Sequence, residues 1–119
     1  MSRILVADDD KDMLALTERW LLREGYTVDT AVSGGEALDK LSGTRPDLIL
    51  LDYRMPGMDG LQTLERIRED ESNRDIPVII RTGDGELAGN EKALQGAYAV
   101  VPKSLGKPGL LNEVSQALR

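Results

Sequence analysis

The chain has 119 residues, the ordinary size of a single domain, and its content of 40% apolar and 30% charged residues is typical of a globular protein. It contains no cysteine and no histidine, which excludes disulfides, thiolate chemistry, histidine acid–base catalysis and phosphohistidine formation on this chain. Its net charge of −6 argues against direct nucleic-acid binding, which depends on basic side chains neutralising phosphates. No apolar run approaches the roughly 18 residues of a membrane span. We therefore expect a cytoplasmic protein with no membrane partner.

In the first half of the chain, short apolar runs alternate with amphipathic stretches. Strands are predicted over 3–7, 26–31 and 47–51. Helical spacing predicts a first helix from Met13 to Glu24, with Gly25 as its stop and Asp10 as its N-cap. A second helix is predicted over 34–41, because Ser33 and Glu36 have the spacing of a capping box.

The same alternation continues in the second half. It predicts a helix over 61–68, a strand over 76–80, a weak helix over 87–95 and a strand over 99–101. Pro108 stands where a last helix would begin. Five strand–helix units with continuously apolar strands predict an α/β fold, a doubly wound parallel sheet with helices on both faces.

Four of these strands end in residues suited to chemistry. Functional groups of such sheets gather beyond the carboxyl ends of the strands. We therefore expect the groups to meet at one edge: Asp8, Asp9, Asp52, Thr82 and Lys103.

Clustered carboxylates repel one another unless a cation compensates, and Mg²⁺ (or Mn²⁺) prefers oxygen ligands. Asp9 and Asp52 are candidates for direct ligation, with Asp8 acting through water. A carboxylate beside such an ion can also attack phosphorus and form an aspartyl phosphate. The Thr82 hydroxyl and the Lys103 ammonium would then stabilise the phosphoryl oxygens.

Three segments resemble the receiver domains of two-component response regulators, such as the chemotaxis regulators. These are Ile4-Leu5-Val6-Ala7-Asp8-Asp9, Leu51-Asp52-Tyr53-Arg54-Met55-Pro56-Gly57-Met58-Asp59-Gly60 and the strand end Thr82-Gly83. The loop Asp-x-x-Met-Pro-x-Met-Asp-Gly behind a buried strand is highly specific, and the resemblance spans essentially the whole chain. It implies one receiver domain over 1–119, with the flavodoxin-like strand order 2-1-3-4-5.

The resemblance also implies roles for individual residues. Asp52 would be the phosphoacceptor, Asp8 and Asp9 the metal-binding pair, and the backbone carbonyl of Arg54 a further metal ligand. Thr82 would be the switch hydroxyl. Lys103 and Lys107 compete for the lysine role, and we choose Lys103 because it directly follows the fifth strand.

As a receiver, the chain would be a phosphoprotein of a phosphorelay and not an enzyme beyond its own Mg²⁺-dependent phosphorylation and dephosphorylation. A sensor histidine kinase or a histidine phosphotransfer protein would donate the phosphoryl group. The surface of the fourth helix, fifth strand and fifth helix would then change and engage an output domain, an effector protein or a second copy.

Three features depart from the family pattern. Ser104 follows Lys103 where receivers have a proline in a cis peptide bond, so the chain takes either a strained cis bond or another trans path. Val100 replaces the usual switch aromatic, and the neighbouring ring is Tyr98. Pro102 requires the fifth strand to lie at the edge of the sheet.

Arg54 and Asp84 flank the predicted site with opposite charges. Our hypothesis is that they pair across its mouth, restrict the attacking water and prolong the life of the phosphate.

Three other functions compete with a phosphorylated switch. A haloacid-dehalogenase-like phosphatase would use Asp8 and Asp10, but it needs Thr or Val where Asp12 stands, a cap and more chain. A flavin-binding domain would place phosphate where the three aspartates repel it. A degenerate receiver that binds partners without phosphorylation stays open, because the region of Val100 and Ser104 is altered.

Overall fold

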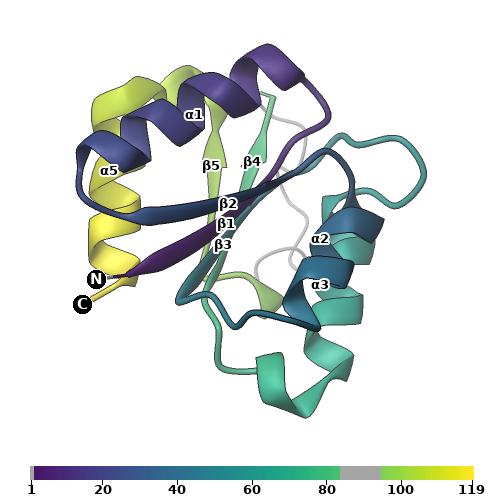
Figure 1. The fold of residues 1–119 in the computed structure, drawn as a ribbon. Helices are drawn as coiled ribbons and strands as arrows, with labels where there is room; N and C mark the ends of the chain where they lie inside the picture. Colours follow the sequence, from purple (N-terminus) through teal and green to yellow (C-terminus); the bar gives the residue numbers. More distant parts are fainter. Residues whose placement is uncertain (1, 84–94) are drawn as a thin grey trace.

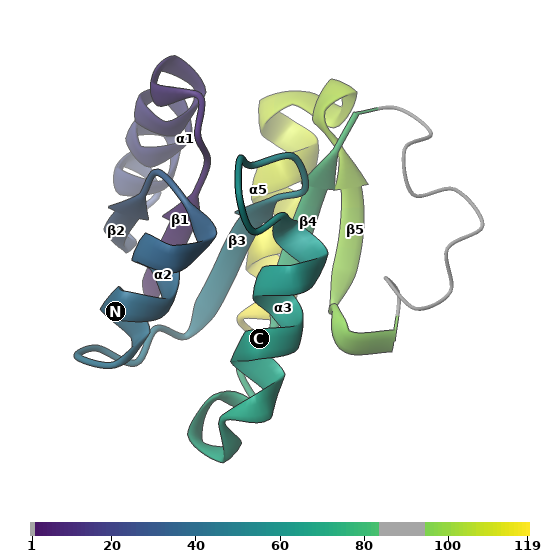
Figure 2. The ribbon, with the colours of Figure 1, turned by 90° about the vertical axis from the view of Figure 1, so that its right-hand side faces the viewer.

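The computed structural model describes residues 2–83 and 95–119. These form a parallel sheet with the strand order β2-β1-β3-β4-β5 (Figure 2). The strands are β1 (Arg3–Ala7), β2 (Thr27–Ala31), β3 (Leu48–Asp52), β4 (Val78–Thr82) and β5 (Ala99–Pro102). The predicted fold class and strand order are confirmed, and β5 is an edge strand, as Pro102 requires.

Helices cover both faces of the sheet (Figure 1). α1 (Lys11–Arg23) and α5 (Gly106–Ala117) lie on one face, and α2 (Gly34–Leu41) and α3 (Gly60–Glu69) lie on the other. Two short 3₁₀ turns, η1 (Glu71–Asn73) and η2 (Lys103–Leu105), precede β4 and α5. The helix predicted over 87–95 lies, except for its last residue, outside the described residues. Within the described ranges, no helix is both long and apolar enough to cross a membrane.

Strand alternation divides the core into two halves. Leu48 and Leu50 of β3 pack in the cluster beneath α1 and α5, whereas Ile49 and Leu51 pack in the cluster beneath α2 and α3. Every residue of β3 and of β4 is buried. A strand covered on both faces needs apolar side chains at successive positions, which is why these strands are continuous apolar runs.

The helix boundaries follow from the capping residues. The Asp10 carboxylate accepts hydrogen bonds from the backbone N–H groups of Asp12 (3.0 Å) and Met13 (3.2 Å), so the predicted N-cap of α1 is confirmed. After α1 the chain turns at Gly25, whose φ of 93° favours glycine. α5 begins at Gly106, two residues before Pro108. Pro108 still lies in the first turn, where a missing N–H removes no intrahelical bond.

Candidate functional site

Three aspartates meet at the carboxyl ends of β1 and β3. Ala7 pairs with Leu51 in register, so the next residues, Asp8 and Asp52, continue side by side. Carboxylate oxygens of Asp8, Asp9 and Asp52 all lie within 4.8 Å of one another. Asp8 and Asp52 are only 2% and 3% exposed, whereas Asp9 faces solvent. The predicted acidic cluster is therefore formed by two buried carboxylates and one accessible carboxylate.

Burial and mutual repulsion shape the electrostatics of this cluster. The pKa of Asp8 is raised from 3.8 to about 6, chiefly by burial and also by the nearby charge of Asp52, while a backbone N–H bond from Asp10 and the charge of Lys103 act to lower it. That bond, from Asp10 N to Asp8 Oδ1, measures 3.0 Å. Burial and the neighbouring carboxylate both disfavour the ionised form of Asp8, and a divalent cation bound by these carboxylates would compensate for both effects.

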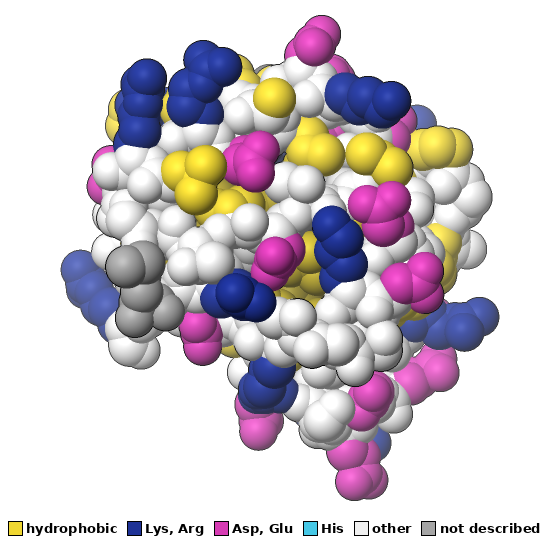
Figure 3. Space-filling model, viewed as in Figure 1, with side chains coloured by type: hydrophobic (Ala, Val, Ile, Leu, Met, Phe, Trp, Pro, Cys, Tyr) yellow, Lys and Arg dark blue, Asp and Glu magenta, His cyan; other side chains and the backbone are white. Residues whose placement is uncertain are grey.

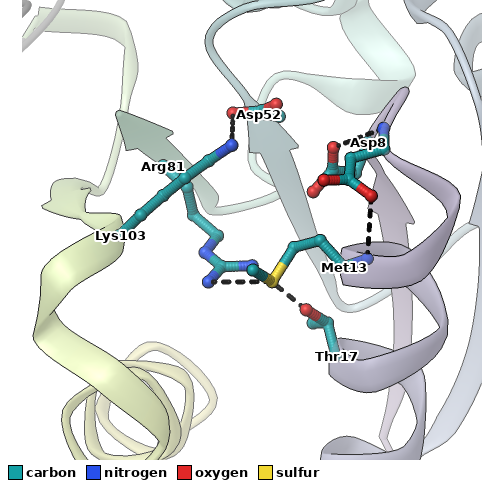
Figure 4. Close-up of polar contacts among 7 residues, drawn as sticks. Asp8, Met13, Thr17, Asp52, Arg81 and Lys103 are labelled. Carbon is teal, nitrogen blue, oxygen red and sulfur yellow. Dashed lines mark hydrogen bonds and ion pairs between the residues drawn. The ribbon is translucent and has the colours of Figure 1, made fainter. Parts of the chain in front are cut away.

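Lys103 supplies positive charge from the opposite side. Its Nζ lies 3.0 Å from Oδ1 of Asp52 (Figure 4). Of the two lysines considered from sequence, Lys103 is the one that the fold pairs with Asp52; Lys107 lies within α5. All peptide bonds of the described residues are trans, so the chain takes the trans path at Lys103–Ser104 and enters η2 there.

The loop after Asp52 is folded back onto the end of β3 by Asp59 and Gly60. The Asp59 carboxylate accepts from Gln62 N (2.9 Å), and the Gln62 side chain accepts from Asp59 N (3.0 Å), a complete capping box for α3. Gly60 N donates to the Tyr53 carbonyl at 2.8 Å. A Cβ atom at Gly60 would lie 2.7 Å from the Asp52 carbonyl oxygen, so only glycine allows this close return.

A depression of about 270 Å³ opens beside the acidic cluster and is lined by Asp9, Tyr53, Arg54, Met55, Pro56 and Asp59. Arg54, whose backbone carbonyl is a predicted ligand, therefore lies in the same hollow as Asp9. The donors of the cluster are all oxygens. This set fits a hard divalent cation such as Mg²⁺, which typically takes one or two carboxylates and keeps several waters.

The structure places three of the remaining residues singled out from the sequence, and a fourth lies outside its described part. Thr82 is buried at the end of β4, one residue after Arg81, which pairs in register with Asp52. Val100 packs partly buried against the α2–α3 side of the core, and Tyr98 is 48% exposed. Asp84 lies outside the described residues, so its pairing with Arg54 stays a prediction.

Arg81 is a buried charge that the sequence reasoning missed. It is 5% exposed, its Nη1 donates to Oγ1 of Thr17 at 3.1 Å, and its Nη2 lies 4.0 Å from Sδ of Met13. Burial lowers the pKa of its guanidinium, while the charges of Asp8 and Asp52 act in the opposite direction. One feature of the sequence could have indicated this buried charge: Arg81 directly follows the apolar run 78–80 of the predicted fourth strand.

Comparison with known proteins agrees with this geometry. The model of the response regulator receiver domain family matches residues 4–115. The chain is 38% identical over 112 residues to the transcriptional regulatory protein PrrA of Mycobacterium leprae, covering 94% of this chain and 46% of PrrA. It is 39% identical over 107 residues to the response regulator PleD of Caulobacter vibrioides, covering 90% and 23% of the two chains. The chain thus spans less than half the length of these curated relatives.

Solved structures show the same fold. The response regulator TrrA of Thermotoga maritima, in complex with Mg²⁺-BeF, has a TM-score of 0.90 and 35% identity, with 99% of this chain and 100% of that chain covered. The chemotaxis protein CheY4 of Vibrio cholerae has a TM-score of 0.92 and 26% identity, with 99% of each chain covered.

The chain therefore belongs to the response regulator receiver domain family of two-component systems. Receiver domains are signalling domains. The resemblance drawn from the loop motif is confirmed.

Proposed function

We propose that this chain is a phosphorylation-dependent switch in which Asp52 accepts a phosphoryl group with the help of Mg²⁺ (or Mn²⁺). The observation that carries the proposal is the buried Asp52 carboxylate, paired with Lys103 at 3.0 Å and gathered with Asp8 and Asp9. The complex of TrrA with Mg²⁺-BeF supports it, because TrrA is similar along its whole length.

In the transfer, an oxygen of Asp52 forms a bond to phosphorus while the bond from phosphorus to the donor atom breaks, and its electron pair leaves with the donor. Lys103 Nζ, already beside Asp52, binds one phosphoryl oxygen, and the Thr82 hydroxyl donates to another. Asp8, Asp9, Asp52 and the Arg54 backbone carbonyl would hold the divalent cation, which would supply positive charge to neutralise the phosphoryl oxygens. Water attack on phosphorus then restores Asp52 and releases phosphate.

The proposed partners follow from the family. A sensor histidine kinase or a histidine phosphotransfer protein donates the phosphoryl group to residues 1–119, which act as one receiver domain in the cytoplasm. Phosphorylation shifts the surface formed by the predicted fourth helix (87–95), β5 and α5, which then binds an output domain, an effector protein or a second copy, without direct nucleic-acid or membrane contact. The described part of this surface exposes Tyr98 and Leu105 by 48% and 42%. Acidic and basic side chains are interspersed over the face shown in Figure 3.

Phosphate lifetime would be set at the mouth of the pocket. We keep the hypothesis that Arg54 and Asp84 restrict the attacking water. Arg54→Ala and Asp84→Ala are each expected to speed dephosphorylation, measured as the decay of the phosphorylated form. Unchanged decay in both variants would remove the hypothesis.

A phosphorylation-independent interaction module is the second candidate, favoured by Val100 where a switch aromatic would stand. One experiment separates the two: incubation with acetyl phosphate and Mg²⁺, followed by intact-mass analysis. We expect one added phosphoryl group in the wild type and none in Asp52→Asn. Asp10→Asn is the matched control, because asparagine also caps a helix, the Asp10 side chain bonds α1, and the substitution keeps the backbone N–H that bonds Asp8.

A wild-type chain that gains no phosphoryl group would favour the interaction module. Modification that persists in Asp52→Asn, or that needs no divalent cation, would contradict the proposed chemistry.

A further inference from the structure

Arg81 carries a buried charge that the proposed phosphoryl transfer does not use. Strand alternation places it on the face of the sheet covered by α1 and α5, because Ile79, two residues earlier, belongs to the core cluster on that face. Val6 and Leu50 belong to the same cluster, so Asp8 and Asp52 share this face with Arg81.

These three residues also form a row across neighbouring strands. Asp52 pairs in register with Arg81, and Asp8 lies one position beyond the pair Ala7–Leu51. Neighbouring strands are about 4.8 Å apart, so the backbone positions of two buried aspartates and one buried arginine lie side by side along the strand ends.

The guanidinium is held in place from the helix side. Its contacts with Thr17 Oγ1 and Met13 Sδ draw it toward α1, beneath the acidic cluster and apart from the Lys103 ammonium (Figure 4). Thr17 itself is fully buried. The two cations therefore differ: the Lys103 side chain is 35% exposed at the mouth of the site, whereas Arg81 is fixed within the protein.

We propose that Arg81 is a fixed counter-charge of the acidic cluster that weakens binding of the divalent cation and strengthens binding of the phosphoryl group at Asp52. The inference rests on the metal and phosphoryl sites proposed above. Arg81 acts through space as a positioning charge; it is neither a metal ligand nor a catalytic residue.

The two signs follow from electrostatics. A guanidinium is permanently charged, and screening by water is weak at a residue 5% exposed. It repels a divalent cation that shares its carboxylates, and it attracts the added negative charge of a phosphoryl group. The charges of Asp8 and Asp52 in turn favour the charged form of the guanidinium, which acts against the lowering of its pKa by burial.

Arg81→Met removes the charge and keeps an unbranched apolar side chain, shorter than that of arginine because it lacks the guanidinium. Buried ionic groups can often be replaced by apolar residues of similar volume without loss of stability. The Thr17 hydroxyl retains a partner, because a threonine in a helix can bond the carbonyl four residues earlier. Arg81→Gln is a second neutral variant with a polar side chain.

The test measures two affinities in the same full-length chain. Mg²⁺ alone is titrated by calorimetry, and beryllofluoride, a phosphoryl mimic, is then titrated at saturating Mg²⁺. For both neutral variants we expect Mg²⁺ to bind at least about tenfold more tightly and beryllofluoride at least about tenfold more weakly, because unit charges about 12 Å apart at an effective dielectric constant near 20 already give a tenfold effect. Structural damage would weaken both affinities, so the opposite signs identify a charge effect.

Thr17→Val is the matched control, because it removes the 3.1 Å hydrogen bond and leaves the charge. We expect both of its affinities to stay within about twofold of wild type, well below the effect of removing the charge. The inference would be overturned if the affinities for Mg²⁺ and beryllofluoride changed in the same direction, or did not change, in Arg81→Met and Arg81→Gln. It would also be overturned if Thr17→Val changed the two affinities as much as removal of the charge does. A wild-type chain that binds no Mg²⁺ would instead overturn the proposed function.

Discussion

At the scale of single residues, Lys103 and Asp52 form an ion pair of unequal partners. Asp52 is buried and Lys103 is partly exposed. Partly exposed pairs contribute little to stability, typically about 0–1 kcal/mol. The importance of Lys103 is therefore its position: its ammonium already lies where a phosphoryl oxygen on Asp52 needs a partner.

We expect Lys103→Ala to slow phosphorylation by acetyl phosphate by about 100-fold, the usual loss when one preorganised donor is removed. Lys107→Ala is the control, because it removes a lysine four residues away in α5. Its rate should equal that of the wild type. The phosphorylation rates are measured by intact-mass time courses. An equal loss of rate in Lys103→Ala and Lys107→Ala would contradict the choice of Lys103.

At the scale of elements, the approach of α3 to the end of β3 positions the loop of the site. It depends on Gly60, where a Cβ would meet the Asp52 carbonyl oxygen at 2.7 Å and Tyr53 Cα at 2.9 Å. Both contacts are with backbone, so relief requires the loop or the helix to shift.

Gly60→Ala should lower the free energy of unfolding by about 1–3 kcal/mol, the usual cost of overpacking. It should also weaken Mg²⁺ binding, because the loop carries Arg54. Gly35→Ala is the matched control, since a Cβ there meets nothing within 4 Å and the residue lies in α2. That change should stabilise by about 0.4–1 kcal/mol. Urea unfolding gives the free energy of unfolding of both variants. An unchanged value for Gly60→Ala would show that the loop can shift to accommodate the Cβ atom without loss of stability.

At the scale of the whole molecule, the buried acidic cluster makes stability depend on pH. The pKa of Asp8 is raised from 3.8 to about 6 in the folded, metal-free chain, so the folded state holds the proton more tightly than the unfolded state. The contribution of Asp8 to the free energy of unfolding is therefore fully present below about pH 4. It is lost as the pH rises toward about 6, by about 2–3 kcal/mol in all.

We expect added Mg²⁺ to raise the melting temperature more at about pH 8 than at about pH 5, because the cation binds the ionised form of Asp8. Asp8→Asn should remove the contribution of this group to the pH dependence. Thermal unfolding with and without Mg²⁺ measures both effects. A rise in melting temperature that does not depend on pH would contradict the raised pKa.

Much of this arrangement could be predicted from sequence because it depends on local pattern. Short apolar runs mark the strands, and Asp8, Asp52, Thr82 and Lys103 stand at or just beyond the ends of the first, third, fourth and fifth of them. Since parallel strands end at one edge, the meeting of Asp8, Asp9 and Asp52 follows from strand order alone. The caps Asp10 and Ser33 follow from side chains that bond the next turn.

Only the tertiary structure decided which charges become partners. The sequence favours Lys103 over Lys107 by its place after the fifth strand, and the trans path through η2 brings the Lys103 ammonium to Asp52. The burial of Arg81 depends on Thr17 and Met13, which come from a helix more than sixty residues earlier. A sequence pattern assigns a side chain to a face of the sheet. What covers that face, and hence how far water screens each charge, is set by contacts between residues distant in the chain.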